Sequence, residues 1–94
     1  MVTIDVRHKV RDFERWKQMF DGAAGARRAA GELACRIYLR HGSADDVLVS
    51  MDWESLERAQ AFLASPELAA GMQAAGVREM PQIAILRRVD HYAP

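Results

Sequence analysis

VTIDVRHKV, at residues 2–10, alternates apolar and polar side chains and is the stretch that decides the fold. VLVSMDW, at residues 47–53, repeats this alternation 45 positions later, and the same offset carries Ala-Ala-Gly at 29–31 onto Ala-Ala-Gly at 74–76. Alternation with a period of two is typical of a strand that buries one face. The sequence therefore predicts two related halves, each with a strand, a helix ending at Ala-Ala-Gly, and another strand.

The first helix has a clear start and an expected break. Asp12 is a suitable N-cap, because its carboxylate can accept hydrogen bonds from the free N–H groups of the first turn. Gly22 and Gly25 each cost a helix about 1 kcal/mol relative to Ala. We therefore expect a bend or break at these glycines before Gly31 ends the helix.

The second helix is also predicted to consist of two pieces. Ser55 can start it, and Ser-Pro-Glu at 65–67 provides a new cap, a proline for the first turn and an acid near the positive end of the dipole. Gly76 is the expected end of this helix.

The stretch 42–45 is predicted to be a turn that joins two antiparallel strands. The inward residues of the first of these strands are expected to be Leu33, Cys35, Ile37, Leu39 and His41, and the last strand of the chain is marked by Ile83, Ile85 and Val89.

The order β-α-β-β-α-β in 94 residues predicts an α+β fold, a single ferredoxin-like domain over residues 1–94. The expected sheet is antiparallel, with strand order 4-1-3-2 and both helices on one face. The open face then carries charged residues, including Arg7, Arg36, Asp5 and Asp52, beside apolar ones, including Tyr38, Leu48 and Leu86. This mixture favours a homodimer joined through the open sheet faces, in which arginines pair with aspartates; the alternative is a single solvated sheet.

Composition excludes several functional classes. Thirteen basic and thirteen acidic residues cancel, so no overall field attracts nucleic acid or an anionic membrane surface. No apolar stretch approaches the ~20 residues of a membrane span, and no signal peptide opens the chain. Cys35 is the only cysteine, which rules out an intrachain disulfide and favours the cytoplasm. Metal-ligand spacings and phosphate-binding glycine motifs are absent.

His8 is the best candidate for a catalytic residue. Its strand parity places it on the helix-covered face, near the first turn of the first helix. A neutral imidazole there can accept a proton from a phenol or an acidic C–H group. The alternative is a structural histidine that is hydrogen-bonded to the backbone or to a capping aspartate.

Large side chains provide candidate walls for a pocket that binds a small aromatic molecule. They are Trp16, Phe20, Met51, Trp53 and Met72. In a small domain such residues more often form the core, and Trp16 is the main expected exception because the first helix starts close to His8. His41 is interpreted as a solvated turn residue and Cys35 as an inert buried thiol, while Tyr92 has no assigned role.

The sequence also resembles a known family. VRHKVRDFERWKQMFD at 6–21, DDVLVSMDWESLERA at 45–59, SPEL at 65–68 and AAGV at 74–77 are similar to the small dimeric α+β barrel proteins grouped with antibiotic-biosynthesis monooxygenases. The resemblance implies a homodimer with a ligand cavity between helices and sheet in each protomer. In monooxygenase members, molecular oxygen oxidises an electron-rich polycyclic phenol to a quinone without metal or flavin, so no cofactor is expected.

Other members of this superfamily degrade haem, isomerise or cyclise substrates, or have no known activity. The haem-degrading members depend on an Asn and on an axial His in the second half. This chain has no Asn and no His between 42 and 90, so haem degradation is not expected. Three hypotheses stay open. They are a monooxygenase-like protein that uses His8, a non-enzymatic ligand-binding or stress-related dimer, and a cyclase or isomerase with the same cavity.

Overall fold

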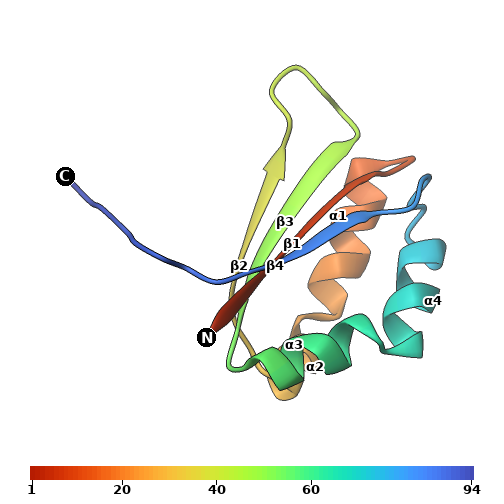
Figure 1. Cartoon of the computed structure of the whole chain (residues 1–94). Helices are drawn as coiled ribbons and strands as arrows, with labels where there is room; N and C mark the ends of the chain where they lie inside the picture. The colour runs from red at the N-terminus through yellow and green to blue at the C-terminus, as the bar shows by residue number, and fades with distance from the viewer.

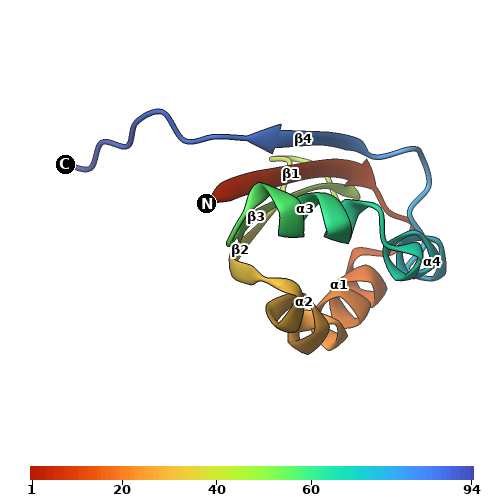
Figure 2. The ribbon, with the colours of Figure 1, turned by 60° about the horizontal axis from the view of Figure 1, so that its bottom comes forward.

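A computed structural model describes residues 1–94, and its four strands form one antiparallel sheet in the order β2-β3-β1-β4. This is the predicted order, counted from the opposite edge. Figures 1 and 2 show the helices on one face of the sheet. The elements in chain order are β1 (Val2–Lys9), α1 (Phe13–Gly22), α2 (Ala24–Ala30), β2 (Glu32–Leu39), β3 (Asp46–Trp53), α3 (Leu56–Leu63), α4 (Pro66–Ala74) and β4 (Gln82–Leu86).

The predicted helix signals are confirmed. The Asp12 carboxylate accepts from a backbone N–H of the first turn of α1, and Ser55 and Ser65 do the same for α3 and α4. The first helix breaks between α1 and α2 at Ala23, beside Gly22, and Gly31 ends α2 with a φ of 123°. None of the four helices is long and apolar enough to cross a membrane.

Several details of the strand predictions are wrong. β2 ends at Leu39, which is 39% exposed, and His41 lies beyond it in an exposed turn rather than on the inward face of the strand. A bulge between Glu32 and Ala34 shifts the register of β2 against β3, so Leu33 leaves the inward face and is 56% exposed. β4 ends at Leu86, and Val89 lies beyond it in an exposed C-terminal tail. Figure 1 shows this tail extending away from the sheet.

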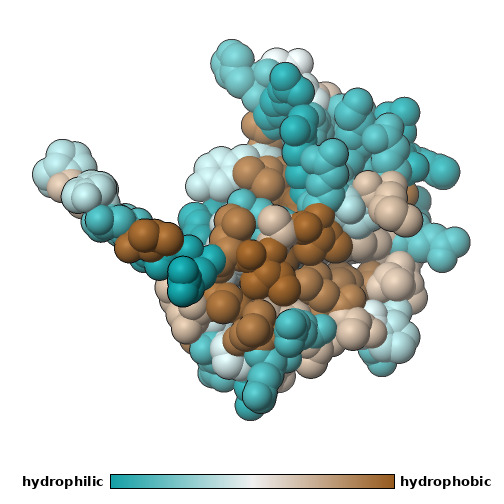
Figure 3. Space-filling view, viewed as in Figure 1, coloured by the Kyte–Doolittle hydropathy of each residue, from teal (hydrophilic) through white to brown (hydrophobic).

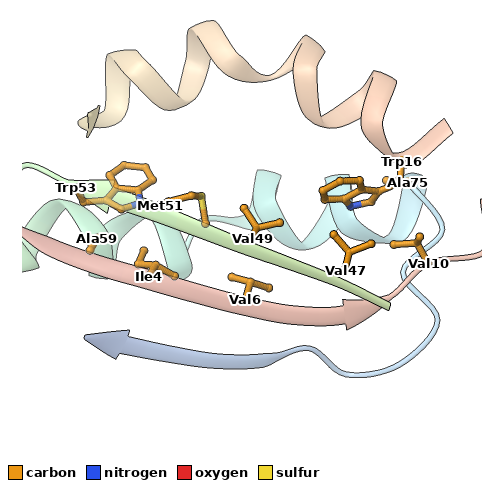
Figure 4. Close-up of a cluster of buried hydrophobic side chains, with 10 residues drawn as sticks. All are labelled: Ile4, Val6, Val10, Trp16, Val47, Val49, Met51, Trp53, Ala59 and Ala75. Atoms are coloured by element: carbon orange, nitrogen blue, oxygen red, sulfur yellow. The ribbon is translucent and has the colours of Figure 1, made fainter. Parts of the chain in front are cut away.

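The core is a row of side chains on the helix-covered face of the two central strands. Figure 4 shows this row with Trp53 at one end and Trp16 at the other. Its strand members are Ile4, Val6, Val47, Val49, Met51 and Trp53, and Val10 continues the row directly after β1. Burying each such side chain contributes about 1.5–3 kcal/mol, so the two central strands hold most of the hydrophobic stabilisation.

Ion pairs within the chain occupy much of the open face. The Arg36 guanidinium donates to both oxygens of Asp52, which also accepts from the Thr3 hydroxyl. Arg7 pairs with Asp46 at 2.9 Å. Pairing of Arg7 and Arg36 with aspartates was expected across a dimer, but one chain already satisfies both arginines.

Candidate ligand cavity

A cavity of about 600 Å³ lies between the sheet and the helices, within the range of typical small-molecule sites. Figure 2 shows α3 close against β1, α1 and α2 farther from the sheet, and α4 at the side of the molecule. Small residues face this space from three helices. Ala26 and Ala30 lie on α2 and Ala23 precedes it. Ala61 lies on α3, Gly71 lies on α4, and Ala75 follows α4. These short side chains cannot reach across to the sheet, which leaves the interior open. Fourteen of the twenty lining residues are hydrophobic.

The structure brings most of the predicted site residues together. His8, Trp16, Phe20, Met51 and Met72 all line the cavity. Trp53 is not among the lining residues, because it is fully buried against Phe62, with ring centroids 4.6 Å apart. Phe62 itself lines the cavity, so Trp53 supports the wall from behind.

His8 is buried without any hydrogen-bond partner. Only 6% of the residue is exposed, and neither ring nitrogen meets solvent or a polar group of the protein. The Trp16 indole contacts the imidazole edge-to-face at 5.4 Å between centroids. Burial lowers the pKa of His8 below its usual 6.5, and the nearby Asp46 carboxylate opposes this shift. The imidazole is therefore neutral at pH 7.

An aromatic wall runs along α1. Phe13, Trp16 and Phe20 are three and four residues apart, and the rings of Trp16 and Phe20 stack with centroids 5.0 Å apart. The side chains of Trp16 and Phe20 both line the cavity. This wall offers a flat surface on which a planar ring system can stack.

Arg27 is a cavity residue that the sequence interpretation missed. Its side chain is only 8% exposed, and its Nε–H donates to Glu32 at 2.9 Å. The guanidinium lies 3.7 Å above the Phe20 ring and donates to the Phe20 carbonyl oxygen. The spacing of Trp16, Phe20, Ala23 and Arg27 follows one helical stripe, and this pattern was the available signal.

A second cavity of about 160 Å³ also has His8 in its lining. Its other lining residues are Arg7, Lys9, Asp46, Glu79, Met80 and Gln82, of which only Met80 is hydrophobic. His8 thus borders an apolar space and a polar one.

The remaining candidates lie away from the cavity lining. His41 is exposed in the turn after β2, and Tyr92 is exposed in the C-terminal tail. Cys35 is half-buried, and this burial raises the pKa of its thiol, which keeps the sulfur protonated and unreactive. No three His, Cys, Asp or Glu side chains are grouped at metal-binding distances.

Comparison with solved structures identifies proteins of the same fold. SnoaB, a cofactor-independent oxygenase from Streptomyces nogalater, matches with a TM-score of 0.80 and 14% identity over 96% of this chain and 94% of that chain. A monooxygenase from the gene ActVA-Orf6 of Streptomyces coelicolor, in complex with the ligand nanaomycin D, matches with a TM-score of 0.70 and 17% identity over 99% and 91%. An antibiotic biosynthesis monooxygenase matches with a TM-score of 0.74 and 9% identity over 96% and 100%.

The resemblance to antibiotic-biosynthesis monooxygenases is thereby confirmed at the level of the fold. No protein-family model matches the sequence, and a comparison with curated proteins finds no match either.

Proposed function

We propose that the chain binds a small aromatic or polyketide-like molecule in the large cavity and oxidises it with molecular oxygen. His8 is the general base, and neither metal nor flavin takes part. The observation that carries this proposal is an apolar cavity of ligand size with a buried, unpartnered histidine in its wall. SnoaB and the ActVA-Orf6 monooxygenase, which share this fold, support the reaction class.

The chemistry begins with removal of a proton. A neutral His8 accepts it from a phenol or from an acidic C–H of the ligand, and the resulting electron-rich anion reacts with oxygen. For an anthrone, the ring CH₂ becomes C=O: one oxygen atom of O₂ enters the ring and the other leaves in water. The apolar walls exclude bulk water from the anion. His8 then returns the accepted proton to the oxygen atom that leaves as water, which restores the neutral imidazole.

An oxygen electrode with 1,8-dihydroxy-9-anthrone as the probe tests this function. The wild-type protein should raise oxygen uptake above the protein-free rate, with an anthraquinone as product. His8→Ala should lower kcat by about 10²-fold or more, the usual contribution of a general base. His41→Ala is the matched control, because it removes an exposed histidine outside the cavity. Full turnover by a folded His8→Ala variant would contradict the role of His8 as the general base.

One observation favours a second function, ligand binding without turnover. Both ring nitrogens of His8 are covered, so His8 or Trp16 must move before a ligand can share a proton with the imidazole. A binding protein needs no such movement. In that case His8→Ala lowers the melting temperature and leaves the affinity for the probe unchanged. Conversion of a probe without oxygen uptake would instead indicate a cyclase or isomerase.

The protein is proposed to act as a homodimer joined through the open sheet faces. Tyr38 and Leu86 are exposed there, beside the half-buried Leu48. The Asp5 Oδ1 atom on this face is buried and has no hydrogen-bond partner within the chain. A facing copy would cover the apolar side chains and can supply a donor to that oxygen.

A further inference from the structure

Arg27 and His8, two polar side chains of the cavity lining, lie toward opposite ends of the sheet. Glu32, which holds Arg27, is paired in register with Trp53, at the end of the sheet where β1 begins. The strand position of His8 lies near the other end of β1, about 20 Å from that of Glu32 at ~3.3 Å per residue, while the Arg27 and His8 side chains themselves approach each other more closely. The aromatic wall connects the two ends. Trp16 contacts His8 at 5.4 Å and Phe20 at 5.0 Å, and Phe20 contacts the guanidinium of Arg27 at 3.7 Å.

Arg27 has hydrogen-bond donors that the protein does not use. A guanidinium carries five N–H groups in a planar fork. In Arg27 the Nε group donates to Glu32 and the Nη1 group donates to the Phe20 carbonyl, while Nη2 makes no hydrogen bond. Because this side chain is buried and lines the cavity, its unused donors are available to a ligand inside the cavity.

A second cationic side chain lies at the same end. Arg58 also lines the cavity, and its guanidinium donates to the carbonyl oxygen of Ala30 at the end of α2. Arg58 also forms an ion pair with Glu54, an exposed residue that precedes α3. The cavity therefore has two arginines around the end of α2 and a neutral imidazole at the far end; Glu67, the one acidic lining residue, lies at the start of α4 and accepts from the Ser65 hydroxyl. This arrangement fits a ligand with an anionic group at one end.

We infer that the α2 end of the cavity is a carboxylate subsite, in which Arg27 binds the carboxylate of an aromatic ligand whose reacting ring lies toward His8. The inference rests on the proposed binding of an aromatic ligand, and it adds the class of that ligand: a planar aromatic acid. Guanidinium binds carboxylate through two parallel N–H···O bonds, a geometry that neutral carbonyl compounds do not match. The competing interpretation is purely structural: the ion pair with Glu32 ties α2 to β2.

Binding of two matched probes separates these interpretations. Anthraquinone-2-carboxylate and anthraquinone-2-carboxamide have the same ring system and a substituent of similar shape, but only the carboxylate is charged. Binding is followed by quenching of tryptophan fluorescence, since Trp16 lines the cavity. The wild-type protein should bind the carboxylate about tenfold more tightly. Arg27→Met should remove this preference, because it weakens binding of the carboxylate about tenfold more than binding of the carboxamide. Arg28→Met, an exposed arginine on the same helix, is the matched control and should retain the preference.

Glu32→Gln gives a test that loss of folding cannot imitate. It removes the carboxylate that competes for Arg27, so affinity for the carboxylate probe should rise several-fold while that for the carboxamide stays the same. Equal wild-type affinity for the two probes, or a preference that survives Arg27→Met, would overturn the subsite and leave the proposed function standing. Failure of both probes to bind would overturn the subsite and the proposed function together.

Discussion

At the scale of single residues, the burial of His8 makes stability depend on pH. The unfolded chain protonates this imidazole near pH 6.5, whereas the folded chain does so only at lower pH, because burial lowers the pKa of His8. The unfolded state therefore binds more protons below pH 6.5. The stabilisation by neutral His8 is complete above that pH and is lost as the pH falls from 6.5 toward the folded pKa.

Denaturant unfolding at a series of pH values between 7.5 and 5 measures this loss. The wild-type free energy of unfolding should fall by up to about 1.4 kcal/mol per pH unit in this window, the limit for one proton. His8→Gln should flatten the curve, and His41→Gln, in an exposed turn, should leave it as in the wild type. An unchanged slope in His8→Gln would contradict the prediction.

Two carboxylates have a separate pH window. Arg7 and Arg36 lower the pKa values of Asp46 and Asp52 below the usual 3.8 through hydrogen bonds. Their contribution is present above that value and is lost only as the pH falls below it. Acid unfolding below about pH 4 is therefore distinct from the loss that His8 causes.

At the scale of elements, the end of α2 requires a glycine both because of its backbone conformation and because there is no room for a side chain. Gly31 has a φ of 123°, a region that side chains with a Cβ rarely adopt, and an added Cβ would lie 2.6 Å from Cδ of Arg58. Gly31→Ala should lower the free energy of unfolding by about 1–3 kcal/mol, measured by denaturant titration. Gly25→Ala is the matched control: this site is in α2 with open space around it, so the change should stabilise by about 0.5–1 kcal/mol. Equal effects at the two glycines would contradict this account.

Features that depend on residues close together in the sequence were predictable, whereas features that depend on distant parts of the chain were not. Caps and stops at Asp12, Ser65 and Gly31 depend on neighbouring residues, and they were predictable. The bulge that exposes Leu33 depends on the pairing of β2 with β3, which no local pattern specifies.

The same distinction applies to the cavity. The strand parity of His8 placed it on the correct face, because alternation is a local property. Arg27 looked like any solvent-exposed helical arginine, because its burial requires Glu32 and Phe20 to approach it in the folded chain. The exclusion of Trp53 from the lining likewise follows from its packing on Phe62.

At the scale of the whole molecule, the sheet leaves apolar surface uncovered. Ile83 and Ile85 pair with β1 residues of the core face, yet both are exposed because β4 is the outer strand, beyond the helices (Figure 2). Figure 3 shows apolar side chains gathered around β4. Together with Tyr38 and Leu86 on the open face, this surface is a reason to expect a second copy of the chain.

Light scattering coupled to size-exclusion chromatography tests the dimer. The wild-type mass should be about twice the 10.6 kDa of one chain. Leu86→Arg should reduce it toward one chain, because a charge at the centre of an apolar interface cannot be paired or hydrated there. Leu56→Arg is the matched control: Leu56 is 48% exposed and Leu86 43%, but Leu56 lies on α3, away from the open sheet face. Dissociation of the dimer by both variants would indicate general destabilisation. A wild-type mass of one chain would contradict the predicted homodimer, and the exposed apolar surface at β4 would then be a candidate binding site for a different protein.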